Sequence, residues 1–128
     1  MKEKTILVVD DEEAIRNSLE KAFSSYGHSV VCADSAEAAR DLLKDERPQV
    51  MFLDLKLPGD DGVELCKQIR KDNPIAVIYA LTGYTSVFDL VDCRSAGFDD
   101  YFVKPVELQT LLRAVNDAVE KLDRWKTV

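Results

Sequence analysis

Short apolar runs alternate with longer amphipathic stretches along the whole chain. The apolar runs are rich in β-branched residues and end at turn residues, which is typical of strands buried on both faces of a parallel sheet. Between them, apolar residues recur every three or four positions, which predicts helices that pack on the sheet. The predicted strands are residues 5–9, 30–33, 50–53, 76–81 and 101–103.

The predicted helices carry recognisable start and stop signals. The acidic run at 10–13 favours the start of a first helix, because carboxylates stabilise the positive end of a helix dipole, and Gly27 ends that helix. Ser35 is predicted to cap the second helix and Asp60 or Asp61 the third. The fourth helix has the weakest amphipathic pattern, and the last has the strongest, at Leu108, Leu111, Leu112, Val115, Val119 and Leu122. Five strands alternating with five helices predict an α/β domain with a doubly wound parallel sheet.

Length and charge narrow the class of protein. The chain of 128 residues is predicted to form one domain, residues 1–128. Its net charge of −7, from 17 basic and 24 acidic residues, argues against binding nucleic acid through a basic surface. No apolar run is long enough to span a membrane, and the N-terminus leads into a strand without a signal peptide.

The cysteines and the single histidine do not predict a zinc site. Cys32, Cys66 and Cys93 are odd in number, widely spaced and in apolar stretches, which indicates buried, reduced thiols in a cytoplasmic protein. His28 is the only histidine, so a zinc site has little support. We interpret His28 as an ordinary residue at the surface or at the edge of the sheet.

Polar side chains follow four of the five predicted strands. They are Asp10 and Asp11 after the first strand, Asp54 after the third, Thr82 after the fourth and Lys104 after the fifth. Because the carboxyl ends of the strands in an open α/β sheet meet at one edge, these side chains are expected to share a cleft. Each has an ordinary structural explanation when taken alone, as a helix cap, a strand end or a solvated charge. Their joint position favours a functional site.

This set of side chains suits phosphoryl chemistry. Clustered carboxylates repel one another unless a cation lies among them, and oxygen ligands with an open face suit Mg²⁺. A metal ion, an ammonium group and a hydroxyl supply the positioning and charge neutralisation that phosphoryl transfer needs. A carboxylate beside the metal can then act as the nucleophile and form an acyl phosphate.

Four motifs at these strand ends resemble those of the receiver domains of two-component response regulators. They are Val-Val-Asp-Asp-Glu at 8–12, Asp-Leu-Lys-Leu-Pro-Gly-Asp-Asp-Gly at 54–62, Leu-Thr-Gly at 81–83 and Ala-Gly-Phe-Asp-Asp-Tyr-Phe-Val-Lys-Pro at 96–105. Each motif alone is a weak indicator, but all four in this order are specific, and the resemblance covers essentially the whole chain. It implies a flavodoxin-like fold with the strand order 2-1-3-4-5, as in the chemotaxis regulators.

The resemblance also implies which residues carry the phosphorylation chemistry. Asp54 would accept a phosphoryl group from a histidine of a sensor kinase or of a phosphotransfer protein. Mg²⁺ or Mn²⁺ would be ligated by Asp11, Asp54 and the backbone carbonyl of Lys56, with Asp10 acting largely through water. The protein would then catalyse only its own phosphorylation and dephosphorylation, and would not be an enzyme with a separate substrate.

A switch coupled to phosphorylation is implied by the same resemblance. Lys104 would pair with the phosphoryl oxygens, and the hydroxyl of Thr82 would move inward to hydrogen-bond one of them. Tyr101 would follow from an exposed to a buried rotamer, which changes the face formed by the fourth helix, the fifth strand and the fifth helix. A downstream output domain or protein would bind that face. The bond between Lys104 and Pro105 resembles the cis peptide of the family.

Two bulky residues are predicted to tune the lifetime of the acyl phosphate. Lys56 lies two positions after Asp54, and Tyr84 lies two positions after Thr82. Both side chains border the path of the water that would hydrolyse the acyl phosphate, so we expect both to slow self-dephosphorylation.

Three other functions compete with this interpretation. A Mg²⁺-dependent phosphohydrolase with an Asp nucleophile is disfavoured, because such enzymes resemble an Asp-x-Asp pattern and Lys56 stands in place of the second acid. A flavodoxin-type binding module would need a phosphate loop rich in Ser, Thr or Gly where this chain has acidic residues 10–13. A receiver that binds its partner without phosphorylation is disfavoured by the intact set of acids, Thr and Lys.

A homodimer formed on phosphorylation is also left open. Leu90, Thr110 and Ala114 occupy positions at which we associate charged residues with the dimer of transcription-factor receivers. That particular dimer is therefore not assumed.

Overall fold

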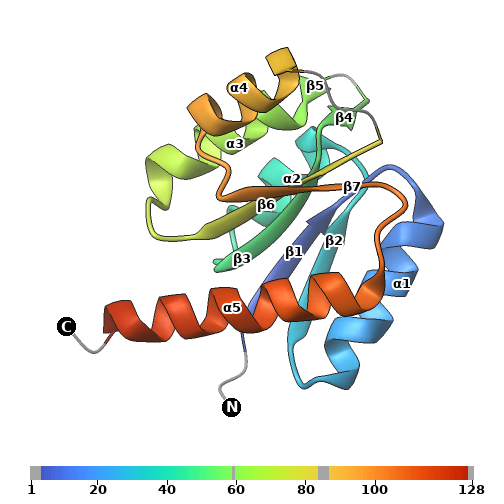
Figure 1. The fold of residues 1–128 in the computed structure, drawn as a ribbon, viewed down its shortest axis with the longest axis vertical. Helices are drawn as coiled ribbons and strands as arrows, with labels where there is room; N and C mark the ends of the chain where they lie inside the picture. Colours follow the sequence, from blue (N-terminus) through green and yellow to red (C-terminus); the bar gives the residue numbers. More distant parts are fainter. Residues whose placement is uncertain (1–3, 59, 84–86, 127–128) are drawn as a thin grey trace.

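The computed structural model describes residues 4–58, 60–83 and 87–126. Its centre is a five-stranded parallel sheet in the order β2-β1-β3-β6-β7 (Figure 1). The strands are β1 (Thr5–Val9), β2 (Ser29–Ala33), β3 (Val50–Asp54), β6 (Val77–Thr82) and β7 (Asp100–Val103). Because β6 and β7 are the fourth and fifth strands of this sheet along the chain, the predicted order 2-1-3-4-5 is confirmed.

Five helices cover the two faces of the sheet, as predicted. They are α1 (Glu13–Ser25), α2 (Ala36–Leu42), α3 (Gly62–Asp72), α4 (Val87–Ala96) and α5 (Leu108–Lys126). Helices α1 and α5 pack on one face and α2, α3 and α4 on the other (Figure 1). None of the described helices is long and apolar enough to cross a membrane.

Strand β3 is buried on both faces and lies at the centre of the sheet. Met51 and Leu53 face the core under α2 and α3, whereas Val50 and Phe52 face the core under α1 and α5. The ring of Phe52 stacks on that of Phe23, with 5.4 Å between the ring centroids. Full burial of one large apolar side chain stabilises the fold by about 1.5–3 kcal/mol. Asp54, the last residue of β3, is therefore attached to a firmly packed central strand.

The segment after β3 contains a small antiparallel hairpin that the sequence pattern does not predict. It consists of β4 (Lys56–Leu57) and β5 (Asp60–Asp61), with Lys56 paired to Asp61. Asp61 is the cap of α3, because its carboxylate accepts a hydrogen bond of 2.8 Å from the N–H of Glu64. A Cβ atom at Gly62 would collide with the carbonyl oxygen of Asp54. Glycine at this position therefore lets α3 start directly against the strand end.

Some predictions of burial are wrong. His28 is buried, with 5% of its surface exposed, because the turn between α1 and β2 folds it against the body of the domain; its N–H donates to the carbonyl of Phe23 at 3.3 Å. Cys32 is only half-buried, since it lies on the edge strand β2. Leu108, the first residue of the apolar pattern in the last helix, opens α5 and is 41% exposed.

Candidate functional site

The polar residues that end the strands lie together at one edge of the sheet. In the parallel register, Asp54 pairs with Leu81 on one side, and the next residue of that strand, Thr82, pairs with Val103. Lys104 follows Val103 directly, and Asp10 follows the last residue of β1. The sequence-based expectation that these side chains share a site is therefore met by the geometry.

Lys104 lies at the centre of the group. Its ammonium nitrogen is 2.8 Å from Oδ2 of Asp10 and 3.3 Å from Oδ2 of Asp54. A third carboxylate, that of Glu12, has its Oε1 3.3 Å from the same nitrogen. Burial by itself would lower the pKa of Lys104, but the surrounding carboxylates, Asp10 above all, outweigh burial and hold the pKa above its usual value. Lys104 is therefore charged, and three carboxylates surround its ammonium group.

Asp54 is an almost fully buried carboxylate. Its side chain is 8% exposed, and Oδ1 accepts a hydrogen bond of 3.0 Å from the N–H of Lys56. Burial raises the pKa of Asp54, as does the charge of Asp10, whereas the Lys56 hydrogen bond and the charge of Lys104 lower it; the balance is a raised pKa. A cation close to this carboxylate would favour its charged, nucleophilic form.

The start of α1 supplies the donor set for such a cation. One carboxylate oxygen each from Asp10, Asp11 and Glu12 lie within 4.8 Å of one another. Asp10 is fully buried, and its Oδ1 accepts a hydrogen bond of 2.9 Å from the N–H of Glu12. Its Oδ2 accepts no hydrogen bond of standard geometry from the described residues and has the ion pair with Lys104. Several hard oxygen ligands with spare lone pairs and excess negative charge fit Mg²⁺ or Mn²⁺.

Thr82 and Tyr101 differ sharply in exposure. Thr82 ends β6 and is 4% exposed, and its carbonyl accepts a hydrogen bond of 2.7 Å from the N–H of Lys104. Tyr101 lies on the edge strand β7 and is 40% exposed. The peptide bond between Lys104 and Pro105 is cis, as the resemblance implies.

The structure describes one of the two predicted tuning residues. The side chain of Lys56 is exposed beside Asp54, and its backbone N–H orients that carboxylate. Tyr84 lies outside the described residues. Glu12 was not predicted as a site residue, because it reads as part of an acidic helix start; its contact joins residues 92 positions apart, which no local pattern reveals.

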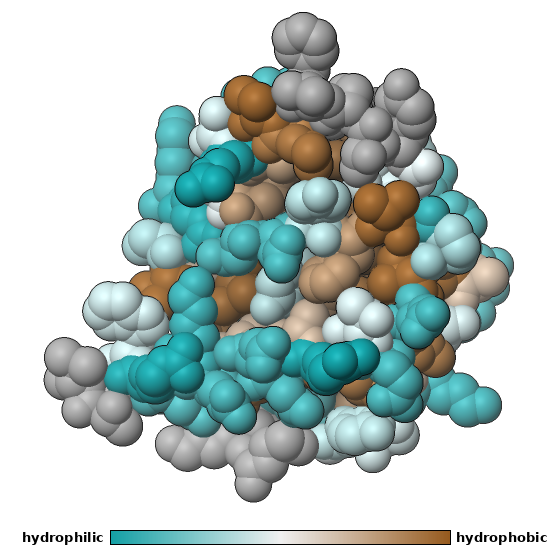
Figure 2. Space-filling view, viewed as in Figure 1, coloured by the Kyte–Doolittle hydropathy of each residue, from teal (hydrophilic) through white to brown (hydrophobic). Residues whose placement is uncertain are grey.

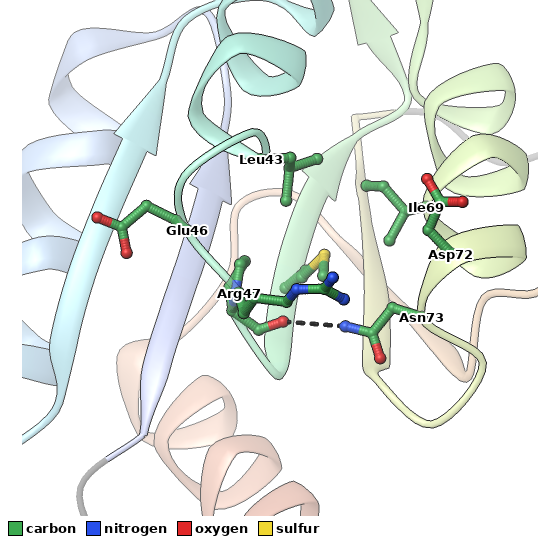
Figure 3. A pocket seen from close by; sticks show the side chains of 8 residues that line it. Leu43, Glu46, Arg47, Ile69, Asp72 and Asn73 are labelled. Carbon is green, nitrogen blue, oxygen red and sulfur yellow. Dashed lines mark hydrogen bonds between the residues drawn. The ribbon is translucent and has the colours of Figure 1, made fainter.

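Two hollows border the sheet at opposite ends. A groove of about 610 Å³ between α1 and the start of α5 begins at Glu12 and Lys104 and is otherwise mainly apolar. A smaller pocket of about 260 Å³ lies at the far end, where Leu43 and Ile69 face each other and the Asn73 amide donates to the Pro48 carbonyl at 3.4 Å (Figure 3). Of these two hollows, the groove adjoins the strand-end site.

Comparison with known proteins identifies relatives over most of the chain. The model of the response regulator receiver domain family matches residues 6–116. Transcriptional regulatory protein AfsQ1 of Streptomyces coelicolor is 36% identical over 123 residues, which cover 96% of this chain and 54% of that protein. Response regulator MprA of Mycolicibacterium vanbaalenii is 42% identical over 107 residues, which cover 84% of this chain and 46% of that protein. The chain thus spans about half the length of these relatives.

Solved structures agree with the family match. A receiver domain protein (CheY-like) from Methanospirillum hungatei superposes with a TM-score of 0.90 at 31% identity, covering 96% of this chain and 99% of that one. NtrX from Brucella abortus superposes with a TM-score of 0.87 at 31% identity, covering 98% of this chain and 30% of that one. Family model, relatives and fold all coincide with the strand-end motifs, and the chain belongs to the response regulator receiver domain family.

Proposed function

We propose that this protein is a phosphorylation-dependent receiver of a two-component system, in which residues 1–128 act as one domain and Asp54 accepts the phosphoryl group. The observation that carries the proposal is the position of Asp54. It is a buried carboxylate at the end of the central strand, 3.3 Å from the Lys104 ammonium group and beside an acidic cluster that fits a divalent cation.

The donor would be a phosphohistidine of a sensor kinase or phosphotransfer protein. A carboxylate oxygen of Asp54 attacks phosphorus as the bond from phosphorus to the imidazole nitrogen breaks, and the bonding electron pair stays on the imidazole. Lys104 donates hydrogen bonds to the phosphoryl oxygens, on which negative charge accumulates. Burial of Asp54 limits the access of water to the acyl phosphate.

A divalent cation completes the proposed site. Mg²⁺ or Mn²⁺ would be held by Asp11, Asp54 and the carbonyl of Lys56, with Asp10 largely through water, and would neutralise charge on the transferring phosphoryl group. The exposed side chain of Lys56 is proposed to slow hydrolysis, and Tyr84 is proposed to do the same from its sequence position alone. The chemistry is confined to the protein's own phosphorylation and dephosphorylation.

The proposed output surface, which a downstream partner would bind, is the face formed by α4, β7 and α5. Thr82 would hydrogen-bond the phosphoryl group, and Tyr101, which is 40% exposed, would turn inward. Figure 2 shows apolar surface over α4 and near the turn from β7 to α5. Val91 and Val103 contribute there, with 58% and 47% of their surface exposed. Such a face suits a downstream protein or output domain.

Other partners and the cellular location follow from the same proposal. AfsQ1 is described as a transcriptional regulatory protein and is about twice as long as the matched region. Direct contact of the present domain with nucleic acid is not part of the proposal, because its net charge is −7. A cytoplasmic location is proposed because Cys32, Cys66 and Cys93 are thiols, and thiols persist in reducing compartments.

Phosphorylation of Asp54 is tested with acetyl phosphate as the donor. The wild-type protein with Mg²⁺ is expected to gain one phosphoryl group by intact-mass spectrometry, and chelation of Mg²⁺ is expected to prevent it. Asp54→Asn should show no adduct, because the amide is not a nucleophile of this kind. Asp72→Asn, which removes an exposed acid at the end of α3, is the matched control and should be phosphorylated normally. An adduct that survives in Asp54→Asn would contradict the proposal.

A further inference from the structure

Glu12 makes a contact that the phosphorylation chemistry does not require. Its Oε1 lies 3.3 Å from the ammonium nitrogen of Lys104, yet its side chain is 60% exposed. The other two carboxylates on that ammonium group, those of Asp10 and Asp54, are 0% and 8% exposed. Glu12 is therefore the solvent-side partner of Lys104.

The backbone directs Glu12 toward Lys104. Glu12 is the N-cap residue of α1, but its side chain makes no capping hydrogen bond within the described part of that helix. Its N–H donates to Asp10 Oδ1 at 2.9 Å and its carbonyl accepts from the N–H of Arg16 at 3.2 Å, so the position of its backbone is fixed. The backbone of Lys104 is held in turn by the hydrogen bond to Thr82. The Glu12–Lys104 pair thus bridges the end of β7 and the start of α1, at the mouth of the apolar groove.

The three contacts of Lys104 differ in how readily they can be given up. An ammonium group has three N–H donors, and in this structure three carboxylates surround it. A phosphoryl group on Asp54 brings new anionic oxygens that compete for those donors. Loss of the contact with Asp10 would leave a fully buried carboxylate poorly compensated, which is costly. Loss of the exposed contact with Glu12 costs little, because water solvates the released carboxylate.

We propose that Glu12 is a positioning residue that holds Lys104 toward the solvent side of the site in the unphosphorylated protein and releases it when Asp54 carries a phosphoryl group. This inference rests on the proposed function of Asp54. Glu12 then opposes phosphorylation: part of the attraction between Lys104 and the phosphoryl group is offset by the lost ion pair. Removing the charge of Glu12 is expected to favour the phosphorylated form.

The first test compares the affinities of the intact protein for beryllofluoride, an anion that mimics a phosphoryl group on a carboxylate. The measurement uses calorimetry with saturating Mg²⁺. Glu12→Gln is expected to bind beryllofluoride about two- to five-fold more tightly than wild type, the factor that corresponds to the loss of one exposed ion pair. Glu13→Gln removes the same charge one residue later and should leave the affinity close to that of wild type.

The second test follows the contact itself by NMR of the Lys104 side-chain nitrogen. Glu12→Gln should shift the Lys104 signal in the unliganded protein and leave it unchanged in the beryllofluoride complex, because the contact is then already lost. An unchanged or weaker affinity in Glu12→Gln, an equal gain in Glu13→Gln, or a shift of equal size in both states would overturn the inference. If wild-type protein failed to bind beryllofluoride with Mg²⁺, the proposed function itself would be at fault.

Discussion

Tyr79 lies in the core between two other aromatic rings, with its ring centroid 5.2 Å from that of Phe52 and 5.4 Å from that of Phe102. Its hydroxyl donates a hydrogen bond of 3.0 Å to the carbonyl of Ala114 on α5. Burial is the main cause that raises the pKa of Tyr79 from 10.0 to about 12, and nearby acidic residues add to this effect. The neutral phenol is therefore part of the packing between β6 and α5.

This pKa predicts a loss of stability in strong base. The unfolded chain ionises Tyr79 near pH 10 and the folded chain only near pH 12, so the stabilisation is full below pH 10 and is lost as the pH rises toward 12. Tyr79→Phe has no group to ionise there. The free energy of unfolding in urea should therefore fall less steeply between pH 10 and 12 in Tyr79→Phe than in wild type. Parallel pH profiles for the two proteins would contradict the assignment.

Single residues also show where sequence-based prediction stops. Asp54, Lys104 and Thr82 could be predicted because each is the polar residue that directly follows an apolar run. The role of Glu12 could not be predicted, since its partner Lys104 is distant in sequence and the acidic residues around it indicate only the start of a helix. His28 was misplaced because a polar residue after glycine looks like a surface turn, and only the fold shows that this turn is covered.

At the scale of elements, Arg70 joins the end of α3 to three other segments. Its guanidinium donates to the carbonyl of Gly97, with 2.6 Å from Nη2, and to the carbonyl of Pro74 at 3.0 Å. It also pairs with Asp99 at 3.0 Å, whose carboxylate accepts from the N–H of Ile78 at 2.8 Å. The end of α4 and the start of β7 are thereby tied to α3 and β6, at the end of the sheet opposite to Asp54.

Arg70→Met is expected to destabilise the protein by about 2 kcal/mol, because carbonyl groups and the Asp99 carboxylate lose their donor. Lys67→Met is the matched control on the same helix. Lys67 is 53% exposed and its described ion pair is with Glu64 at 3.9 Å, so its loss should cost less than about 0.5 kcal/mol. Urea unfolding monitored by circular dichroism measures both. Equal destabilisation by the two substitutions would rule out this role for Arg70.

The elements themselves were largely predictable, and the exceptions have local causes. The Ser35 cap is confirmed by the hydrogen bond of 3.1 Å from the N–H of Ala38 to its hydroxyl. The hairpin of β4 and β5 escaped prediction because two-residue strands are too short to show a period of two. Helix α4 has the weakest pattern because it lies at the end of its layer beside α3, and Val91 on it is 58% exposed.

For the whole molecule, the parallel sheet explains why fold and site could be predicted together. Every strand of this five-stranded sheet runs in the same direction, so the residues that end these strands lie at the same edge. The strand order could not be predicted in the same way, because an alternation of strands and helices fits several orders. The order 2-1-3-4-5 was implied by the resemblance. The tuning role of Tyr84 stays a prediction, because that residue lies outside the described structure.

Concentrating acidic groups at one edge also sets how the whole domain should respond to a divalent cation. The carboxylates of Asp10, Asp11 and Glu12 lie within 4.8 Å of one another, and burial already disfavours the charged form of Asp54. An ion that binds the folded state alone stabilises it by about 2.7 kcal/mol at 100 times its Kd. For a domain of this size, that corresponds to a rise in Tm of roughly 8 °C.

Mg²⁺ at constant ionic strength is therefore expected to raise the Tm of the wild-type protein in thermal unfolding. Asp11→Asn should lose most of this rise, because a neutral amide replaces an exposed carboxylate of the cluster. Asp72→Asn should keep the full rise, since Asp72 lies at the opposite end of the sheet, beside the pocket shown in Figure 3. A rise of the same size in Asp11→Asn would mean that the ion that stabilises the protein binds elsewhere than at the strand-end cluster.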